Sequence, residues 1–127
     1  MATILIIDDD EILHKFLRQI LGKEGHQVEE AFDGMTGLEM ARSCKPDLIL
    51  LDLELPRLNG HKVCQILKAD KNYQSIPIIM MTASLQHEDK QWAEKTGANH
   101  YFTKPFDLEQ LTGTIKELLA QAQNAEG

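Results

Sequence analysis

Short runs of consecutive aliphatic residues alternate with segments of helical periodicity along the chain, and this alternation limits the possible folds severely. A strand that is apolar at every position is typical of a parallel sheet covered by helices on both faces. The sequence therefore predicts an α/β fold whose strands are joined by right-handed helical crossovers. The predicted strands span residues 4–7, 27–31, 47–53, 76–82 and 100–103, and the second of these has the weakest pattern.

Helical periodicity fills the intervals between these strands. It predicts helices over residues 11–21 and 34–43, one around Val63, Ile66 and Leu67, one over 86–96, and one that begins near Leu108. Glycines at positions 22 and 25 are expected to end the first helix. Few apolar residues other than Trp92 support the helix over 86–96, which we expect to be marginal.

Length and charge exclude several classes of protein. The chain has 127 residues, enough for one domain, with an expected core at about 3–121 and a frayed tail at 122–127. Its net charge is −7 without a basic stripe, which argues against direct binding to nucleic acid or to an anionic membrane. No membrane-spanning run or signal peptide is evident, and Cys44 and Cys64 form no paired motif. We expect a cytoplasmic protein with reduced thiols.

Polar side chains follow four of the predicted strands. Asp8 and Asp9 follow the first strand, Asp52 lies near the carboxyl end of the third, Thr82 ends the fourth and Lys104 follows the fifth. With a strand order of 2-1-3-4-5 these residues would meet at the carboxyl edge of the sheet, where ligands of such folds bind. Three crowded carboxylates favour a divalent cation, and oxygen ligands suit Mg²⁺. A carboxylate beside the metal is then a candidate nucleophile for a phosphoryl group.

Four motifs carry a family resemblance over residues 3–121: "IIDDD", "PDLILLDLELPRLNG", "IIMMTAS" and "YFTKPF". Because these four motifs occur in this order, the chain resembles a receiver domain of two-component response regulators. It is similar to the single-domain, chemotaxis-type receivers. The resemblance implies a flavodoxin-like doubly wound (βα)5 fold with a five-stranded parallel sheet of order 2-1-3-4-5.

The resemblance also implies a role for each acidic residue. Asp52 matches the aspartate that accepts the phosphoryl group. Asp9 matches the residue that binds Mg²⁺ directly, and Asp8 the one that acts partly through water. The backbone carbonyl of Glu54 matches a further metal ligand. Asp10 matches a variable, solvent-facing position at the start of the first helix, where a carboxylate suits the helix dipole.

Three further residues match the part of the family's site that holds the phosphoryl group and responds to it. Thr82 matches the hydroxyl that binds the group, Lys104 the lysine that pairs with it, and Tyr101 the aromatic switch residue. The Lys104–Pro105 peptide bond would be cis. Glu54 and Ser84 would flank the path of an attacking water, which leaves the lifetime of the phosphate open.

The predicted function is a signalling switch. A histidine kinase or phosphotransfer protein would transfer a phosphoryl group to Asp52, and the changed surface would act on an effector protein or a fused output domain. Such a chain would catalyse only its own phosphorylation and dephosphorylation. It would not be an enzyme with an external substrate.

Two other functions fit parts of the sequence. A small haloacid-dehalogenase-type phosphatase would use Asp8 as its nucleophile, in a D-x-D pattern completed by Asp10. Such an enzyme needs a later pair of acidic ligands where this chain has "TKPFD", and it needs room for a substrate cap. A flavin-binding electron carrier would need a Gly/Ser/Thr-rich phosphate loop where this chain has "DDDEI". The negative charge of this segment is the opposite of what a phosphate needs, so we reject this function.

Overall fold

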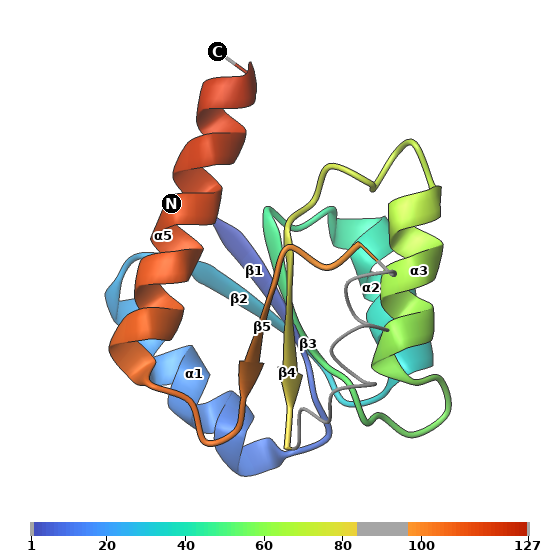
Figure 1. Ribbon diagram of the computed structural model, residues 1–127. Coiled ribbons are helices and arrows are strands. Elements are labelled where there is room, and N and C mark those ends of the chain that lie inside the picture. Colours follow the sequence, from blue (N-terminus) through green and yellow to red (C-terminus); the bar gives the residue numbers. More distant parts are fainter. Residues whose placement is uncertain (1, 84–96, 127) are drawn as a thin grey trace.

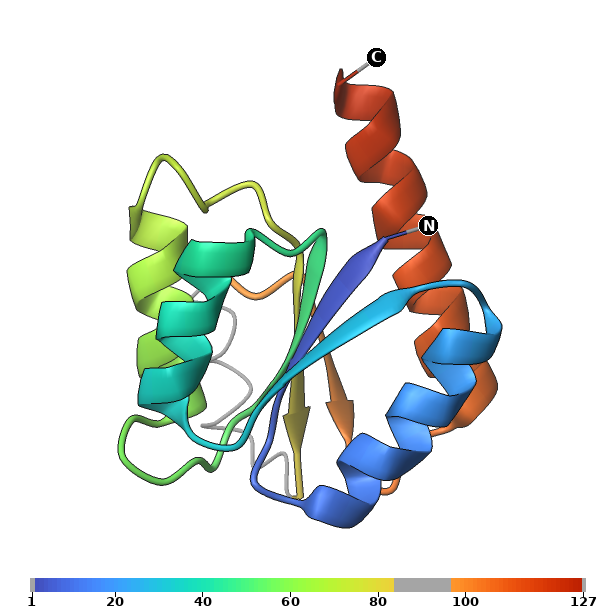
Figure 2. The ribbon, with the colours of Figure 1, turned by 180° about the vertical axis from the view of Figure 1, so that it is seen from behind.

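The computed structural model describes residues 2–83 and 97–126, and its centre is a five-stranded parallel sheet between two layers of helices (Figure 1). The sheet has the order β2-β1-β3-β4-β5, which confirms the predicted fold and strand order. The strands are β1 (Thr3–Ile7), β2 (Gln27–Ala31), β3 (Leu48–Asp52), β4 (Ile78–Thr82) and β5 (His100–Thr103). The helices are α1 (Glu11–Lys23), α2 (Gly34–Cys44), α3 (Gly60–Ala69) and α5 (Leu108–Glu126). Helices α1 and α5 cover one face, and α2 and α3 cover the other (Figures 1 and 2).

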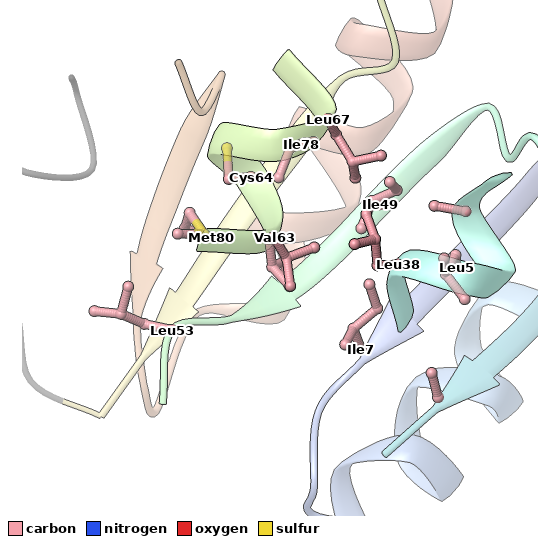
Figure 3. Packing of buried hydrophobic residues seen from close by; sticks show 13 residues of the cluster. Leu5, Ile7, Leu38, Ile49, Leu53, Val63, Cys64, Leu67, Ile78 and Met80 are labelled. Carbon is pink, nitrogen blue, oxygen red and sulfur yellow. The ribbon is translucent and has the colours of Figure 1, made fainter. Parts of the chain in front are cut away.

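Burial on both faces explains the continuous aliphatic runs. Successive side chains of a strand point to opposite faces, so each inner strand supplies two cores. In β1, Ile4 and Ile6 pack in the core beneath α1 and α5, whereas Leu5 and Ile7 pack in the core beneath α2 and α3. Figure 3 shows the second core, in which Val63 and Leu67 of α3 lie close to the sheet.

The register of the parallel strands brings their carboxyl ends to one edge of the sheet. Ile7 pairs with Leu51, and Thr82 pairs with Thr103. The arrowheads of β4 and β5 point to this edge in Figure 1. The residues that directly follow β1, β3, β4 and β5 are therefore neighbours in space, although up to about a hundred residues separate them in sequence.

Helix α1 differs from its predicted form in two ways. It continues through Gly22 and ends at Lys23. The chain turns away from the helix two residues later, at Gly25, whose φ of +89° is readily adopted only by glycine. Two residues of its apolar pattern face solvent, since Ile12 is 80% exposed and Phe16 is 48% exposed. The sheet covers only one side of α1, and Leu17 and Leu21 occupy that side.

Other boundaries also differ from the sequence analysis. Strand β4 begins at Ile78 instead of residue 76, because Pro77 has no backbone N–H to give to the ladder. Helix α5 continues to Glu126 through the expected tail at 122–127, where no Gly or Pro interrupts it before Gly127. The predicted helix over 86–96, with Trp92, lies outside the described residues.

Two smaller expectations concern the thiols and the membrane. Neither Cys44 nor Cys64 takes part in a disulfide bond, and Cys64 is a buried residue of α3 in the core on that face of the sheet. Among the described helices, none combines the length and the apolar character that a bilayer crossing requires.

The two sides of α1 should respond differently to truncation. Leu17→Ala should lower the free energy of unfolding by about 2–5 kcal/mol, because it opens a cavity in a fully buried position. Ile12→Ala should change this free energy by no more than about 0.5 kcal/mol, because the side chain is mostly exposed. Urea unfolding of both variants measures the difference. Equal losses would contradict the orientation of α1.

Candidate functional site

Three carboxylates meet where β1 and β3 end. Oxygen atoms of Asp8, Asp9 and Asp52 all lie within 4.8 Å of one another, which is close enough to share one metal ion. Asp8 and Asp52 are buried, whereas Asp9 is exposed. Charges this close repel one another in a site that water reaches poorly. The geometry therefore favours a bound cation, and an all-oxygen donor set suits Mg²⁺.

Asp8 is held at every polar group. Its backbone N–H donates to the Ala31 carbonyl at 3.1 Å. One carboxylate oxygen accepts from the Asp10 backbone N–H at 2.9 Å, and the other accepts from the Lys104 ammonium at 2.7 Å. The Asp8 carboxylate, which has no exposed surface, thus has partners on both oxygens. Its direction is fixed before any ligand binds.

Lys104 lies between two of the acidic side chains. Its Nζ is 2.7 Å from Asp8 and 3.6 Å from Asp52, and its backbone N–H donates to the Thr82 carbonyl at 2.7 Å. Burial disfavours the ammonium form, but the hydrogen bond and charge of Asp8 outweigh burial and raise the pKa of Lys104. The side chain is therefore a fixed positive charge. The peptide bond to Pro105 is cis, as the resemblance implied.

Asp52 is the carboxyl group whose ionisation the site opposes most clearly. Burial, followed by the negative charge of Asp8, raises the pKa of Asp52 to about 6 from its ordinary value of 3.8. Lys104 and a hydrogen bond to the Glu54 backbone act in the opposite direction without cancelling the rise. A cation bound among the three carboxylates would remove this penalty.

The remaining predicted residues lie at the same edge or near it. Thr82 is buried at the end of β4, and Tyr101 is partly buried on β5, where it pairs with Met80. The side chain of Glu54 is exposed in the loop after β3. The roles of Thr82 and Tyr101, and of the Glu54 carbonyl as a metal ligand, remain predictions. Ser84 lies outside the described residues.

Asp10 behaves as expected for the start of a helix. Its side chain accepts from the backbone N–H groups of Ile12 and Leu13, and so it caps α1. Asp10 is also exposed, which confirms the expected solvent-facing position at the start of the first helix.

Gly60 is a residue next to the site for which the sequence predicted no role. Asn59 caps α3, and the Gly60 N–H donates to the Leu53 carbonyl at 2.9 Å. A Cβ at position 60 would clash with the Asp52 carbonyl oxygen and would lie 2.8 Å from the Leu53 Cα. Only glycine permits this approach of α3 to the end of β3. The Asn-Gly pair at positions 59 and 60 is a turn signal, but it does not indicate this contact with β3.

Comparison with known proteins identifies the family. The model of the response regulator receiver domain matches residues 4–116. The chain belongs to the response regulator receiver family. Members of this family are receivers in two-component signal transduction. Nothing in the comparison favours the alternative function, a haloacid-dehalogenase-type phosphatase.

Relatives of this receiver differ in length. It is 42% identical over 120 residues to protein PilH of Pseudomonas aeruginosa, an alignment that covers 94% of this chain and 99% of PilH. It is also 42% identical to the DNA-binding dual master transcriptional regulator RpaA of Synechocystis, over 94% of this chain but only 49% of RpaA. The receiver thus spans about half the length of RpaA and nearly all of PilH.

A solved structure bears on the metal. The receiver domain of a sensor histidine kinase from Pseudomonas aeruginosa superposes with a TM-score of 0.86 and 27% identity, covering 94% of this chain and 98% of that one. That domain was solved with a magnesium ion coordinated in its active site cleft.

The raised pKa of Asp52 gives a test of the site without metal. Between pH 3.8 and about 6 the folded state binds more protons than the unfolded state, so stability falls as the pH rises through this window. Asp52→Asn removes this loss and should raise the free energy of unfolding at pH 7.5 by about 1–2 kcal/mol. Urea unfolding in EDTA at pH 4.5 and 7.5 should show the gain only at the higher pH. A variant that is less stable at pH 7.5, or a gain independent of pH, would contradict the repulsion.

Gly60→Ala tests the close approach beside Asp52. Its Cβ would meet backbone atoms that cannot rotate away, so we expect a loss of about 1–3 kcal/mol in the free energy of unfolding. Gly113→Ala is the control, because a Cβ there meets no atom within 4 Å and should stabilise α5 by up to about 1 kcal/mol. Thermal or urea unfolding of the two variants and the native chain measures these changes in the free energy of unfolding. A neutral Gly60→Ala would show that the approach is not required.

Proposed function

We propose that Asp52 accepts a phosphoryl group from a histidine kinase or a phosphotransfer protein in a reaction that requires Mg²⁺. One observation carries this proposal: Asp52 ends β3 within a cluster of three carboxylates, and the ammonium of Lys104 contacts two of them, Asp8 and Asp52. In a receiver chain, this arrangement combines a nucleophile with the positive charge that phosphoryl transfer needs.

Asp8, Asp9, Asp52 and the backbone carbonyl of Glu54 would hold the metal ion. The fit is supported by the oxygen donors within 4.8 Å of one another and by the raised pKa of Asp52, which indicates excess negative charge. When bound, Mg²⁺ supplies positive charge that neutralises the carboxylates and the oxygens of the incoming phosphoryl group.

The side chains of the receiver would divide the chemistry among them. A carboxylate oxygen of Asp52 attacks the phosphorus atom, and a P–O bond forms as the P–N bond to the donor histidine breaks, leaving its electron pair on the imidazole. Lys104, which already lies 3.6 Å from Asp52, compensates the charge of the phosphoryl oxygens. The Thr82 hydroxyl donates a hydrogen bond to one of them.

Phosphorylation would then change the surface around β5. Thr82 and Lys104 would move toward the phosphoryl group, and Tyr101 would respond to the movement of Thr82. The partner would be an effector protein or a fused output domain; the longer relative RpaA is a DNA-binding transcriptional regulator. We further propose that residues 1–127 act as one cytoplasmic receiver domain that catalyses only its own phosphorylation and dephosphorylation.

Intact mass after incubation with acetyl phosphate tests this function. The native chain should gain one phosphate with Mg²⁺ and none in EDTA. Asp52→Asn should gain none, because the amide nitrogen is not a nucleophile for phosphorus. Asp8→Asn should lower the gain by weakening the metal site, yet any phosphate that it gains should still depend on Asp52.

Two results would overturn the proposal. A gain that survives Asp52→Asn but disappears in Asp8→Asn would point to Asp8 as the nucleophile. An equal gain in EDTA would remove the metal from the reaction.

A further inference from the structure

A buried histidine lies directly behind the acidic cluster and has no place in the chemistry described above. His14 of α1 is only 1% exposed. Its Nε2 lies 2.6 Å from the backbone carbonyl oxygen of Asp8, and its Nδ1 lies 2.8 Å from a carboxylate oxygen of Glu30 on β2. The ring of Phe32 stacks on the imidazole with a centroid distance of 4.2 Å. The imidazole is thus held on both nitrogens and on one face.

The contact with Asp8 has a defined direction. A backbone carbonyl can only accept, so the 2.6 Å contact requires a proton on Nε2 of His14. The acceptor oxygen belongs to the peptide group that joins Asp8 to Asp9. His14 therefore fixes the plane of the peptide group that leads into Asp9.

The peptide group on the other side of Asp9 is also fixed. The Asp10 backbone N–H donates to the Asp8 carboxylate at 2.9 Å. Asp9 itself is exposed, unlike Asp8 and Asp52, so packing does little to direct its side chain. The direction of the Asp9 carboxylate consequently depends on the two peptide groups that flank it, and His14 holds one of them.

We propose that His14 is a positioning residue for the cation at Asp8, Asp9 and Asp52, acting through the Asp8 carbonyl. This inference rests on the proposed function. Glu30 orients the imidazole, and Arg18 in turn holds Glu30 through an ion pair of 2.7 Å. Groups behind a metal site that orient its ligands commonly change metal affinity by about 10- to 100-fold when they are removed.

Binding of Mg²⁺ measured by calorimetry tests the role of His14. His14→Leu should raise the dissociation constant about tenfold, in the range usual for such orienting groups. His14→Gln places an amide N–H at a similar reach toward the Asp8 carbonyl, so it should restore most of the affinity. A purely structural role would alter the fraction of folded protein but not the dissociation constant of the folded protein.

A second measurement needs no metal. The Asp9 amide belongs to the same peptide group as the Asp8 carbonyl, so its ¹H–¹⁵N resonance in EDTA should move in His14→Leu and return toward the native position in His14→Gln. A third measurement separates metal affinity from the reaction itself. At saturating Mg²⁺ the phosphorylation rate of His14→Leu should stay near that of the native chain, because this variant alters only the affinity for the metal.

Glu30→Gln and Glu29→Gln form a matched pair in case His14→Leu does not fold. Both remove one negative charge from β2, but only Glu30 contacts His14. Glu30→Gln should weaken Mg²⁺ binding more than Glu29→Gln does. Equal dissociation constants for this pair, or for His14→Leu and the native chain, would overturn the inference. A native chain that binds no Mg²⁺ would instead overturn the proposed function.

Discussion

The ion pair between Lys104 and Asp8 is the interaction on which the rest of the site depends. It joins the ends of β1 and β5 over 2.7 Å, although 96 residues separate the partners in sequence. Without this ammonium, the buried carboxylates of Asp8 and Asp52 would face each other with little compensation. The sheet makes the pair possible, because its parallel register brings the carboxyl ends of β1, β3, β4 and β5 to one edge.

Much of this arrangement could be predicted from the sequence because one physical requirement sets it. Strands such as β1 and β3 are aliphatic at nearly every position, and only a sheet covered on both faces buries them completely. Once the strand order is fixed, the residues after each strand must meet. Asp8, Asp52 and Lys104 could therefore be placed together from their positions alone, and their charges indicated a cation.

Features that depend on which neighbour covers a residue could not be predicted. The apolar pattern of α1 includes Ile12 and Phe16, and periodicity does not tell which part of a wide apolar face meets the sheet. His14 was one of five scattered histidines, and of its partners Asp8 follows β1 whereas Glu30 belongs to β2. Gly60 is required by the Asp52 carbonyl, a contact that no sequence pattern describes.

We expect the crowded carboxylates to make this edge of the sheet a cation site, and the ionisation of Asp52 reports on this directly. The side-chain carboxyl carbon of Asp52 can be followed by NMR as the pH is varied, first in EDTA and then with saturating Mg²⁺. We expect a midpoint near pH 6 in EDTA, because burial and Asp8 raise the pKa of Asp52 to about 6. With Mg²⁺ we expect a clearly lower midpoint, because the cation favours the ionised form. A midpoint near 4 in EDTA, or one that Mg²⁺ does not change, would contradict the account.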